Sequence, residues 1–324
     1  MKPEVQRTFE RLRDWLSAGE QAWLCTIVAS QGASPRPVGS LLALNAKGEQ
    51  VGSISGGCIE EELLEQIAAG KLGRGLPEIV AYGLTAEQNA RLSLPCGGEL
   101  KVLIEPCSHE WLSLLDQLLE SLSAREAVSR AVILDSGEWT LSSALVEEGS
   151  PNILLADNRV RHRFSPDYRI LLVGANELAR CVAELAVAMN YQVLVCEPRE
   201  VLHAGWAVQG TKVVSDMPDD ALRMMGADQH TIVLTLTHDP RIDDMALMEA
   251  LNHPLFYVGA LGSIRTSAKR RERLLQLELS EQQIEKLHAP VGLPIGSKTP
   301  MEIAVAIMAE LTSLRTGKVL SPSL

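Results

Sequence analysis

Two cysteines lie in glycine-rich turns, and a thiol in such a place can bind a soft metal or hold sulfur. Cys58 belongs to residues 55–60, which read SGGCIE, and Cys96 belongs to residues 94–99, which read LPCGGE. Glycines leave backbone N–H groups open to an anion, and the start of a helix lowers the pKa of a thiol. We therefore predict two turns that contact a cofactor, formed by Gly56, Gly57 and Cys58 and by Cys96, Gly97 and Gly98.

A structural role is the alternative for these turns, because glycines also form tight turns and cysteine also serves as a small core residue. The carboxylates of Glu60, Glu61 and Glu62 oppose a low thiol pKa at Cys58. There is no C-x-x-C pair, and Cys58 and Cys96 are 38 residues apart without a local histidine, which is not a zinc spacing. We expect the other four cysteines, which lie in or next to apolar segments, in the core: Cys25, Cys107, Cys181 and Cys196.

A nucleotide-binding motif occupies residues 174–179, GANELA, between a predicted strand and a predicted helix. The Rossmann fingerprint has glycine at the first and third positions and glycine or alanine at the sixth, but the third position here is Asn176. Its side chain stands where the pyrophosphate would approach the backbone after Gly174. Glu197 follows Gly174 by 23 residues, where an acidic residue binds ribose hydroxyls, and Arg199 could instead meet a phosphate. The motif predicts a Rossmann-type architecture and leaves nucleotide binding open.

Two more candidate segments follow predicted strands of the same half. His238 lies in residues 237–239, THD, directly after one strand, and Gly262 and Ser263 end the next strand segment, GALGS. The carboxyl ends of parallel strands are where open α/β sheets bind ligands. A helix with five basic residues follows Ser263, and glycines and a serine before a cationic helix suit a phosphate or a pterin phosphate. The alternatives are a loop or capping role for His238 and a solvated face for the basic helix.

Two kinds of fold are needed to position these residues, so we predict an α/β protein. Residues 1–125 predict a mixed α+β domain, and residues 126–166 read as short strands between turns, which we interpret as a β-rich connector. Residues 167–324 alternate strand and helix, which is typical of a doubly wound parallel sheet. The final helix has a clear start, with Thr299 as N-cap, Pro300 at the first helical position and Glu302 completing a capping box.

Composition excludes several classes of function. The chain has 324 residues, which corresponds to roughly two domains of about 150 residues. Its net charge of −11 argues against nucleic-acid binding, because neutralising phosphates requires a basic surface. It has no run of 18 apolar residues and no apolar core of a signal peptide, so we expect a cytoplasmic protein without a membrane partner. The commonest hydrolase and NTPase motifs, G-x-S-x-G, H-E-x-x-H and G-x-x-x-x-G-K-[ST], are also missing.

Six segments resemble the XdhC/CoxI family. They are residues 34–40 (SPRPVGS), 56–60 (GGCIE), 96–98 (CGG), 237–239 (THD), 257–263 (YVGALGS) and 289–304, which begins APVGLPIG and ends TPMEIA. The segments occur in the same order in both halves of the chain, so their joint specificity is high. The resemblance leaves the predicted connector uncovered.

The resemblance implies an N-terminal XdhC/CoxI domain, a C-terminal Rossmann domain and a homodimer. It also implies an accessory chaperone that binds molybdenum cofactor, as molybdopterin or its cytosine dinucleotide, and performs no turnover of its own. Such a chaperone keeps the cofactor while a cysteine desulfurase supplies the terminal sulfido ligand. It then inserts the cofactor into a target molybdoenzyme of the xanthine dehydrogenase or aldehyde oxidoreductase class, and a molybdopterin nucleotidyltransferase is a further partner. On this basis Cys58 and Cys96 are candidate contacts of the cofactor and of its molybdenum.

Two other functions compete with this interpretation. An NAD(P)-dependent oxidoreductase would use Gly174 and Glu197, and it predicts saturable NADH binding. A thiol-based redox protein would use Cys58 and Cys96, and it predicts an intramolecular disulfide on oxidation.

Overall fold

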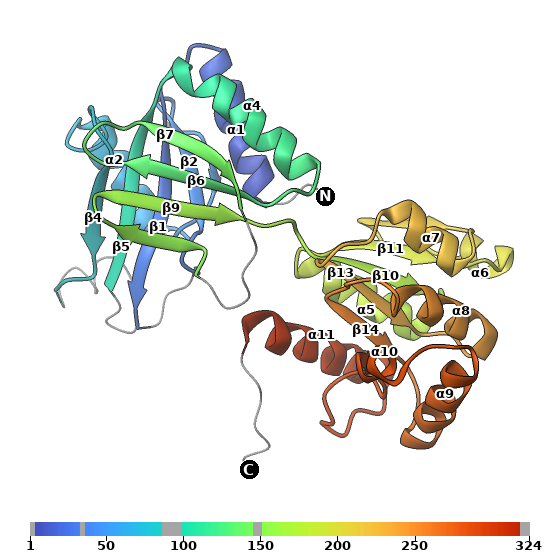
Figure 1. Cartoon of the computed structure of the whole chain (residues 1–324). Coiled ribbons are helices and arrows are strands. Elements are labelled where there is room, and N and C mark those ends of the chain that lie inside the picture. Colours follow the sequence, from blue (N-terminus) through green and yellow to red (C-terminus); the bar gives the residue numbers. More distant parts are fainter. Residues whose placement is uncertain (1–3, 33–35, 86–98, 145–150, 318–324) are drawn as a thin grey trace. The chain divides into compact units, whose positions relative to one another are not determined.

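The computed structural model describes residues 4–32, 36–85, 99–144 and 151–317. The chain divides into two compact units, residues 2–166 and residues 167–324 (Figure 1). The first unit contains two antiparallel sheets and the second a parallel sheet between helices, so the predicted α/β class and the Rossmann-like second half are confirmed.

The first unit is built around an antiparallel sheet with the strand order β3-β2-β1-β5-β4. Its strands are β1 (Ala22–Gln31), β2 (Leu41–Asn45), β3 (Gln50–Gly52), β4 (Glu78–Tyr82) and β5 (Glu99–Cys107). The helices of this unit are α1 (Glu4–Ser17), α2 (Cys58–Ala68), η1 (His109–Trp111) and α4 (Leu112–Ser123). A second antiparallel sheet, with the order β7-β6-β9-β8, consists of β6 (Val128–Ile133), β7 (Trp139–Ser143), β8 (Ile153–Ala156) and β9 (Arg159–Phe164).

The central strand β1 is buried on both faces because its side chains alternate between two apolar cores. Leu24 points into a core formed with α1, α4 and the second sheet, while its neighbour Cys25 points into a core formed with α2. Helix α2 covers its face through Ile59, Leu63 and Ile67, which recur every four residues and so lie on one side of the helix. The sheet is therefore the middle layer of the first unit.

Residues 126–166 contribute the second sheet, and this sheet packs into the same core as α1 and α4. Phe164 of β9 meets Phe9 of α1 edge to face, with 5.3 Å between the ring centroids. The segment therefore belongs to the apolar core of the first unit.

A buried ion pair joins the two sheets of the first unit. Arg130 of β6 donates from Nη1 to Oε2 of Glu105 on β5 (3.0 Å) and from Nη2 to Oε1, and both side chains are at most 3% exposed. The guanidinium packs against both Trp111 and Trp139, with 5.1 and 4.7 Å from Cζ to the ring centroids, which are themselves 5.1 Å apart. The two rings make cation–π contacts with the guanidinium, in place of the water that would surround it on the protein surface. The charge pair and its aromatic walls therefore form one polar cluster inside an apolar core.

His162 packs beside this cluster and makes the stability of the first unit dependent on pH. Burial and the nearby charge of Arg130 lower the pKa of His162 to about 3, so the folded unit keeps the ring neutral. The unfolded chain binds a proton near pH 6.5, so acidification favours unfolding. We expect a loss of about 1.4 kcal/mol per pH unit between pH 6.5 and 5, measured by urea unfolding.

The control for this prediction is His109, the other histidine of the first unit, which is exposed. His162→Leu should abolish the slope between pH 6.5 and 5, and His109→Gln should leave it unchanged. A slope that survives His162→Leu would contradict the assignment.

The second unit is a doubly wound parallel sheet with the strand order β12-β11-β10-β13-β14-β15, which is the Rossmann order. Its strands are β10 (Arg169–Val173), β11 (Gln192–Cys196), β12 (Thr211–Val214), β13 (Thr231–Thr235), β14 (Tyr257–Ala260) and β15 (Leu287–His288). Its helices are α5 (Glu177–Ala188), α6 (Glu200–Ala204), α7 (Pro218–Met225), α8 (Pro240–Ala250), α9 (Ile264–Gln276), α10 (Glu281–Glu285) and α11 (Pro300–Thr316).

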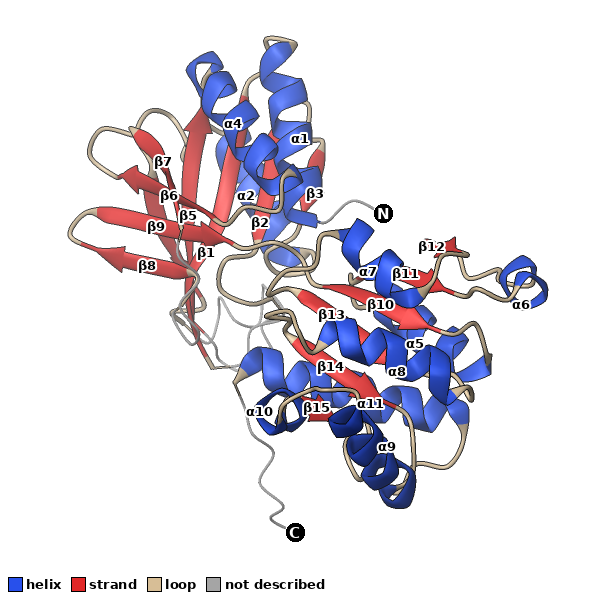
Figure 2. Cartoon of the chain, turned by 45° about the vertical axis from the view of Figure 1, so that its right-hand side comes forward, coloured by secondary structure: helices blue, strands red, loops and turns tan. Residues whose placement is uncertain are grey.

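Helices cover both faces of this sheet (Figure 2). Helices α5 and α11 pack on one face, and α7, α8 and α9 pack on the other. The start of α11 agrees with the prediction from sequence, because Thr299 accepts from the backbone N–H of Glu302 and Glu302 accepts from that of Thr299. Within the described residues, each helix is too short or too polar to cross a bilayer.

Candidate functional site

The ends of several strands lie together at one end of the first sheet of the first unit, next to predicted site residues. β1 ends at Gln31, which pairs with Glu99 at the start of β5, and β4 ends at Tyr82, one residue further along β5. β3 ends at Gly52, beside the start of β2. Because neighbouring strands are antiparallel, these strand ends lie at one end of the sheet, which we call the motif end. The described residues of the connecting segments there are 32, 36–40, 53–57 and 83–85.

The turn of residues 53–57, which precedes α2, is organised by the carboxylate of Glu60. This side chain accepts hydrogen bonds from the backbone N–H groups of Ile54 (2.9 Å), Ser55 (2.8 Å), Gly56 (3.1 Å) and Gly57 (3.0 Å). The two serine hydroxyls of the turn also donate to it. Burial alone would raise the pKa of Glu60, but these hydrogen bonds outweigh it and lower the pKa to about 2. The carboxylate is therefore charged at neutral pH.

Gly56 and Gly57 have φ angles of +90° and +149°, which L-residues rarely adopt. A Cβ at either glycine would meet no described atom within 4 Å, so another molecule could approach the backbone closely here. Their N–H groups already donate to Glu60, so they can receive an external anion only if Glu60 releases them. Cys58 is the first residue of α2.

Four residues of the predicted turns lie wholly or partly outside the described part of the structure. The side chain of Cys58 lies outside the described part of the structure, and so do Cys96, Gly97 and Gly98 entirely.

The other four cysteines are buried and free, which confirms their predicted place in the core: Cys25, Cys107, Cys181 and Cys196. Burial raises the pKa of each of these thiols. These thiols are therefore harder to ionise than an exposed cysteine and lie out of reach of a cofactor that arrives from solution.

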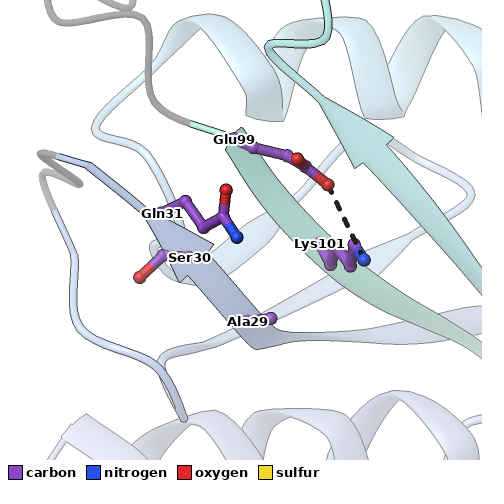
Figure 3. A pocket seen from close by; sticks show the side chains of 5 residues that line it. All are labelled: Ala29, Ser30, Gln31, Glu99 and Lys101. Atoms are coloured by element: carbon purple, nitrogen blue, oxygen red, sulfur yellow. Dashed lines mark ion pairs between the residues drawn. The ribbon is translucent and has the colours of Figure 1, made fainter.

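A small pocket of about 80 Å³ lies at the motif end between β1 and β5 (Figure 3). It is lined by Ala29, Ser30 and Gln31 of β1 and by Glu99 and Lys101 of β5, and the last two form an ion pair of 3.7 Å. Ligand pockets usually measure about 300–1,000 Å³, so this pocket is much smaller than one that encloses a cofactor.

In the second unit, Gly174 and Asn176 form a tight turn between β10 and α5. A Cβ at Gly174 would lie 2.9 Å from Cγ2 of Thr237, so the close approach of the segment that follows β13 favours glycine there. Asn176 is the N-cap of α5 and accepts from the backbone N–H of Ala179 (2.9 Å). Its Nδ2 donates to the carbonyl oxygen of Leu236 after β13 (2.6 Å). Asn176 thus occupies the helix N-terminus that a pyrophosphate would use.

Glu197 is fully buried at the end of β11 and is paired on both oxygens. It accepts from the backbone N–H of Ala175 (2.9 Å) and from Nε and Nη2 of Arg199 (2.7 Å each). Burial raises the pKa of Glu197, but the hydrogen bonds from Arg199 and Ala175 outweigh it, so the pKa is lowered. The carboxylate that would bind ribose hydroxyls is therefore already engaged inside the unit.

The remaining predicted residues also lie at the carboxyl edge of the parallel sheet. His238 is exposed directly after β13. Ser263 is the N-cap of α9 and accepts from the backbone N–H of Thr266 (3.1 Å), which is the capping role of a helix start. Gly262 precedes it, and a Cβ there would approach the Thr266 side chain at 3.2 Å.

Three arginines of the basic helix α9 bind groups inside the second unit. Arg270 donates to Oδ2 of Asp243 (3.0 Å), and Arg273 donates to both carboxylate oxygens of Asp244. Arg271 donates to backbone carbonyl oxygens. Arg265 and Lys269 of this helix are exposed.

A larger pocket of about 390 Å³ lies against α5, and its size is in the range of ligand pockets. Residues 205–208, which include Trp206, form one wall, and Asn176 is the predicted site residue that it includes. The charged side chains of its α5 wall are paired with each other and carry a net charge of −1, because one guanidinium, that of Arg180, forms ion pairs of 2.6 Å with both Glu177 and Glu184.

Where the structure describes them, the predicted residues of each unit lie at one end of one sheet. Gly56, Gly57 and Cys58 lie at the motif end of the first unit. The predicted residues of the second unit lie at the carboxyl edge of its sheet: Gly174, Asn176, Glu197, Arg199, His238, Gly262 and Ser263. Glu60, which the sequence indicates only as a charge that opposes a low thiol pKa at Cys58, also holds the turn through hydrogen bonds. Its third position in α2 is the capping-box position, which could have indicated them.

Comparisons with known proteins agree with the division of the chain into two units. The model of the XdhC and CoxI family matches residues 15–83, and the model of the XdhC Rossmann domain matches residues 170–311. The chain is 26% identical over 321 residues to a probable xanthine dehydrogenase subunit of Bacillus subtilis (strain 168), covering 91% of this chain and 94% of that protein. It is 26% identical over 302 residues to the molybdenum cofactor insertion chaperone PaoD of Escherichia coli (strain K12), covering 93% and 85%.

A solved structure has the same fold. The crystal structure titled as a xanthine dehydrogenase from Bacillus halodurans matches with a TM-score of 0.73 and 25% identity, and the match covers 98% of each chain. Both family models occur in the order that the sequence motifs predict. This chain belongs to the XdhC and CoxI family.

Proposed function

We propose that this protein is an accessory chaperone that binds molybdenum cofactor and inserts it into a molybdoenzyme of the xanthine dehydrogenase or aldehyde oxidoreductase class. The observation that carries the proposal is its similarity, over 93% of the chain, to a relative named as a molybdenum cofactor insertion chaperone. The relatives that support it are named as a chaperone and as a subunit, so we propose no turnover by this chain itself.

The finer parts of the proposal follow from the family resemblance. The protein carries the cofactor as molybdopterin or its cytosine dinucleotide and supports its sulfuration by a cysteine desulfurase. A molybdopterin nucleotidyltransferase is a further partner for the dinucleotide form. The chaperone acts in the cytoplasm as a homodimer.

We place the cargo at the motif end of the first unit. The open space above Gly56 and Gly57 supports a close approach of the cofactor to this turn. Four of the six cysteines are buried with raised pKa values, which leaves Cys58 and Cys96 as the candidate thiolate ligands. A thiolate is a soft ligand that suits molybdenum or bound sulfur.

Cofactor retention tests this placement. The purified protein is mixed with isolated molybdenum cofactor and desalted, and pterin and molybdenum are then assayed. We expect about one cofactor per chain for wild type and a loss of about tenfold or more for Cys58→Ala and Cys96→Ala, because each removes a ligand atom. Cys181→Ala, which makes the same change at a buried thiol of the second unit, should retain as much as wild type.

The outcomes separate the site from the function. Full retention by both Cys58→Ala and Cys96→Ala would refute the cysteine assignment, while no retention by wild type would refute the proposed function.

The alternative oxidoreductase requires NAD(P), and the residues present do not fit its usual pose. The backbone N–H of Ala175 and the carboxylate of Glu197 bind each other, and Asn176 caps α5 in place of the pyrophosphate. Saturable binding of NADH in a fluorescence titration would favour the alternative over the chaperone. The thiol-redox alternative would gain support from an intramolecular disulfide between Cys58 and Cys96 in mass spectra of the oxidised protein.

A further inference from the structure

The backbone of the turn at residues 53–57 requires an anion to hold its shape. Four consecutive N–H groups, from Ile54 to Gly57, converge on one carboxylate with distances of 2.8 to 3.1 Å. Parallel N–H dipoles at the start of a helix repel each other unless a negative charge lies among them. The two glycines add conformational freedom, because glycine adopts many other backbone states besides the positive φ angles seen here.

We infer that Glu60 is the positioning residue of the cofactor site: its carboxylate is a built-in anion that holds the 53–57 turn and so fixes where Cys58 begins α2. This inference rests on the proposed function for the identity of the cargo. The contacts of Glu60 extend from Ser53 to Gly57, so the whole turn is held from one point.

The helix itself has a separate anchor. Ile59 and Leu63 of α2 are fully buried in a core with Leu42, Val102 and Ile104 of the sheet. The side chain of Glu60 is not part of this apolar contact. Replacing Glu60 should therefore release the turn while α2 remains packed, and the effect on the site can be measured in a folded protein.

The test compares three variants of adjacent residues on α2. Glu60→Ala removes the carboxylate and leaves space for a small anion. Glu60→Gln fills the same space with a neutral amide whose NH₂ group opposes the N–H donors of the turn. Glu61→Ala is the matched control, because Glu61 is exposed and its replacement removes the same charge from the same helix.

Hydrogen exchange of a peptide that covers residues 53–57 reports the turn directly, and cofactor retention reports the site. We expect exchange to accelerate about tenfold or more in Glu60→Ala and Glu60→Gln, and retention to fall about tenfold in both. Sodium formate should restore protection and retention in Glu60→Ala, because formate supplies the missing carboxylate. It should not restore them in Glu60→Gln, where the amide fills the space, and Glu61→Ala should behave as wild type.

Each contrary result has a separate meaning. Unchanged exchange in Glu60→Ala would show that the turn does not depend on the carboxylate, which overturns the inference. Faster exchange with full retention would show that the turn does not position the site, which also overturns it. If wild type retains no cofactor, the proposed function fails, while exchange and its recovery by formate still decide whether Glu60 holds the turn.

Discussion

Glu105→Ala is expected to destabilise the first unit by about 3–5 kcal/mol. The variant leaves the guanidinium of Arg130 buried against Trp111 and Trp139 without its carboxylate. A buried charge that loses its partner keeps the full desolvation cost and has no compensating interaction.

Urea unfolding followed by tryptophan fluorescence measures this effect. The signal reports mainly the first unit, which contains four of the five tryptophans: Trp15, Trp23, Trp111 and Trp139. Arg161→Ala is the control, because Arg161 is exposed on β9, the neighbour of β6, and should change stability by no more than about 0.5 kcal/mol.

A double variant separates the lost charge balance from lost packing. Glu105→Leu combined with Arg130→Met removes both charges and keeps apolar volume against the two tryptophan rings. We expect it to be clearly more stable than Glu105→Ala, because replacing a whole buried pair by apolar groups is often neutral or stabilising. An unfolding midpoint of Glu105→Ala equal to that of wild type would refute the importance of the pair.

Asp243→Ala is expected to destabilise the second unit by about 3 kcal/mol. Asp243 is 1% exposed. Its carboxylate accepts hydrogen bonds from the hydroxyl of Thr237 (2.8 Å) and from Nη2 of Arg270 (3.0 Å). Arg270 in turn donates from Nη1 to the carbonyl oxygen of Leu261 (2.9 Å). One carboxylate thus connects the loops that follow β13 and β14, and its removal leaves Arg270 buried without its closest charged partner.

Hydrogen exchange measured by mass spectrometry distinguishes this effect from changes in the first unit. Peptides from β13 and β14 should exchange about a hundredfold faster in Asp243→Ala, while peptides from β1 and β5 should not change. Asp220→Ala is the control, because Asp220 forms an exposed ion pair with Arg223 on α7. Equal acceleration in both units, or none in the second, would contradict the proposed role of Asp243.

Part of the candidate site could be predicted because local rules are sufficient for it. The positions of Gly174 and Glu197 relative to the predicted strands place both at the carboxyl edge of a parallel sheet. The same sequence shows that Asn176 departs from the fingerprint, but not what its side chain does. Its two partners, Ala179 and the carbonyl group of Leu236, are 3 and 60 residues away, and only the fold brings the second one near.

Local chemistry by itself determined the elements and their ends. The capping box at Thr299 and Glu302 and the four-residue spacing of Ile59, Leu63 and Ile67 depend on neighbours within one or two helical turns. The alternation of strands and helices after residue 167 likewise determined the Rossmann architecture, and the spaced motifs determined the family.

Tertiary structure decided the partners of the charged groups. In the sequence, Arg130 lies in a segment without a recognisable motif. The fold sets Arg130 against Glu105, 25 residues away on another sheet. Such pairs depend on the register and packing of whole sheets, because the energy of a buried charge is determined by what surrounds it in space and not by its neighbours in the chain.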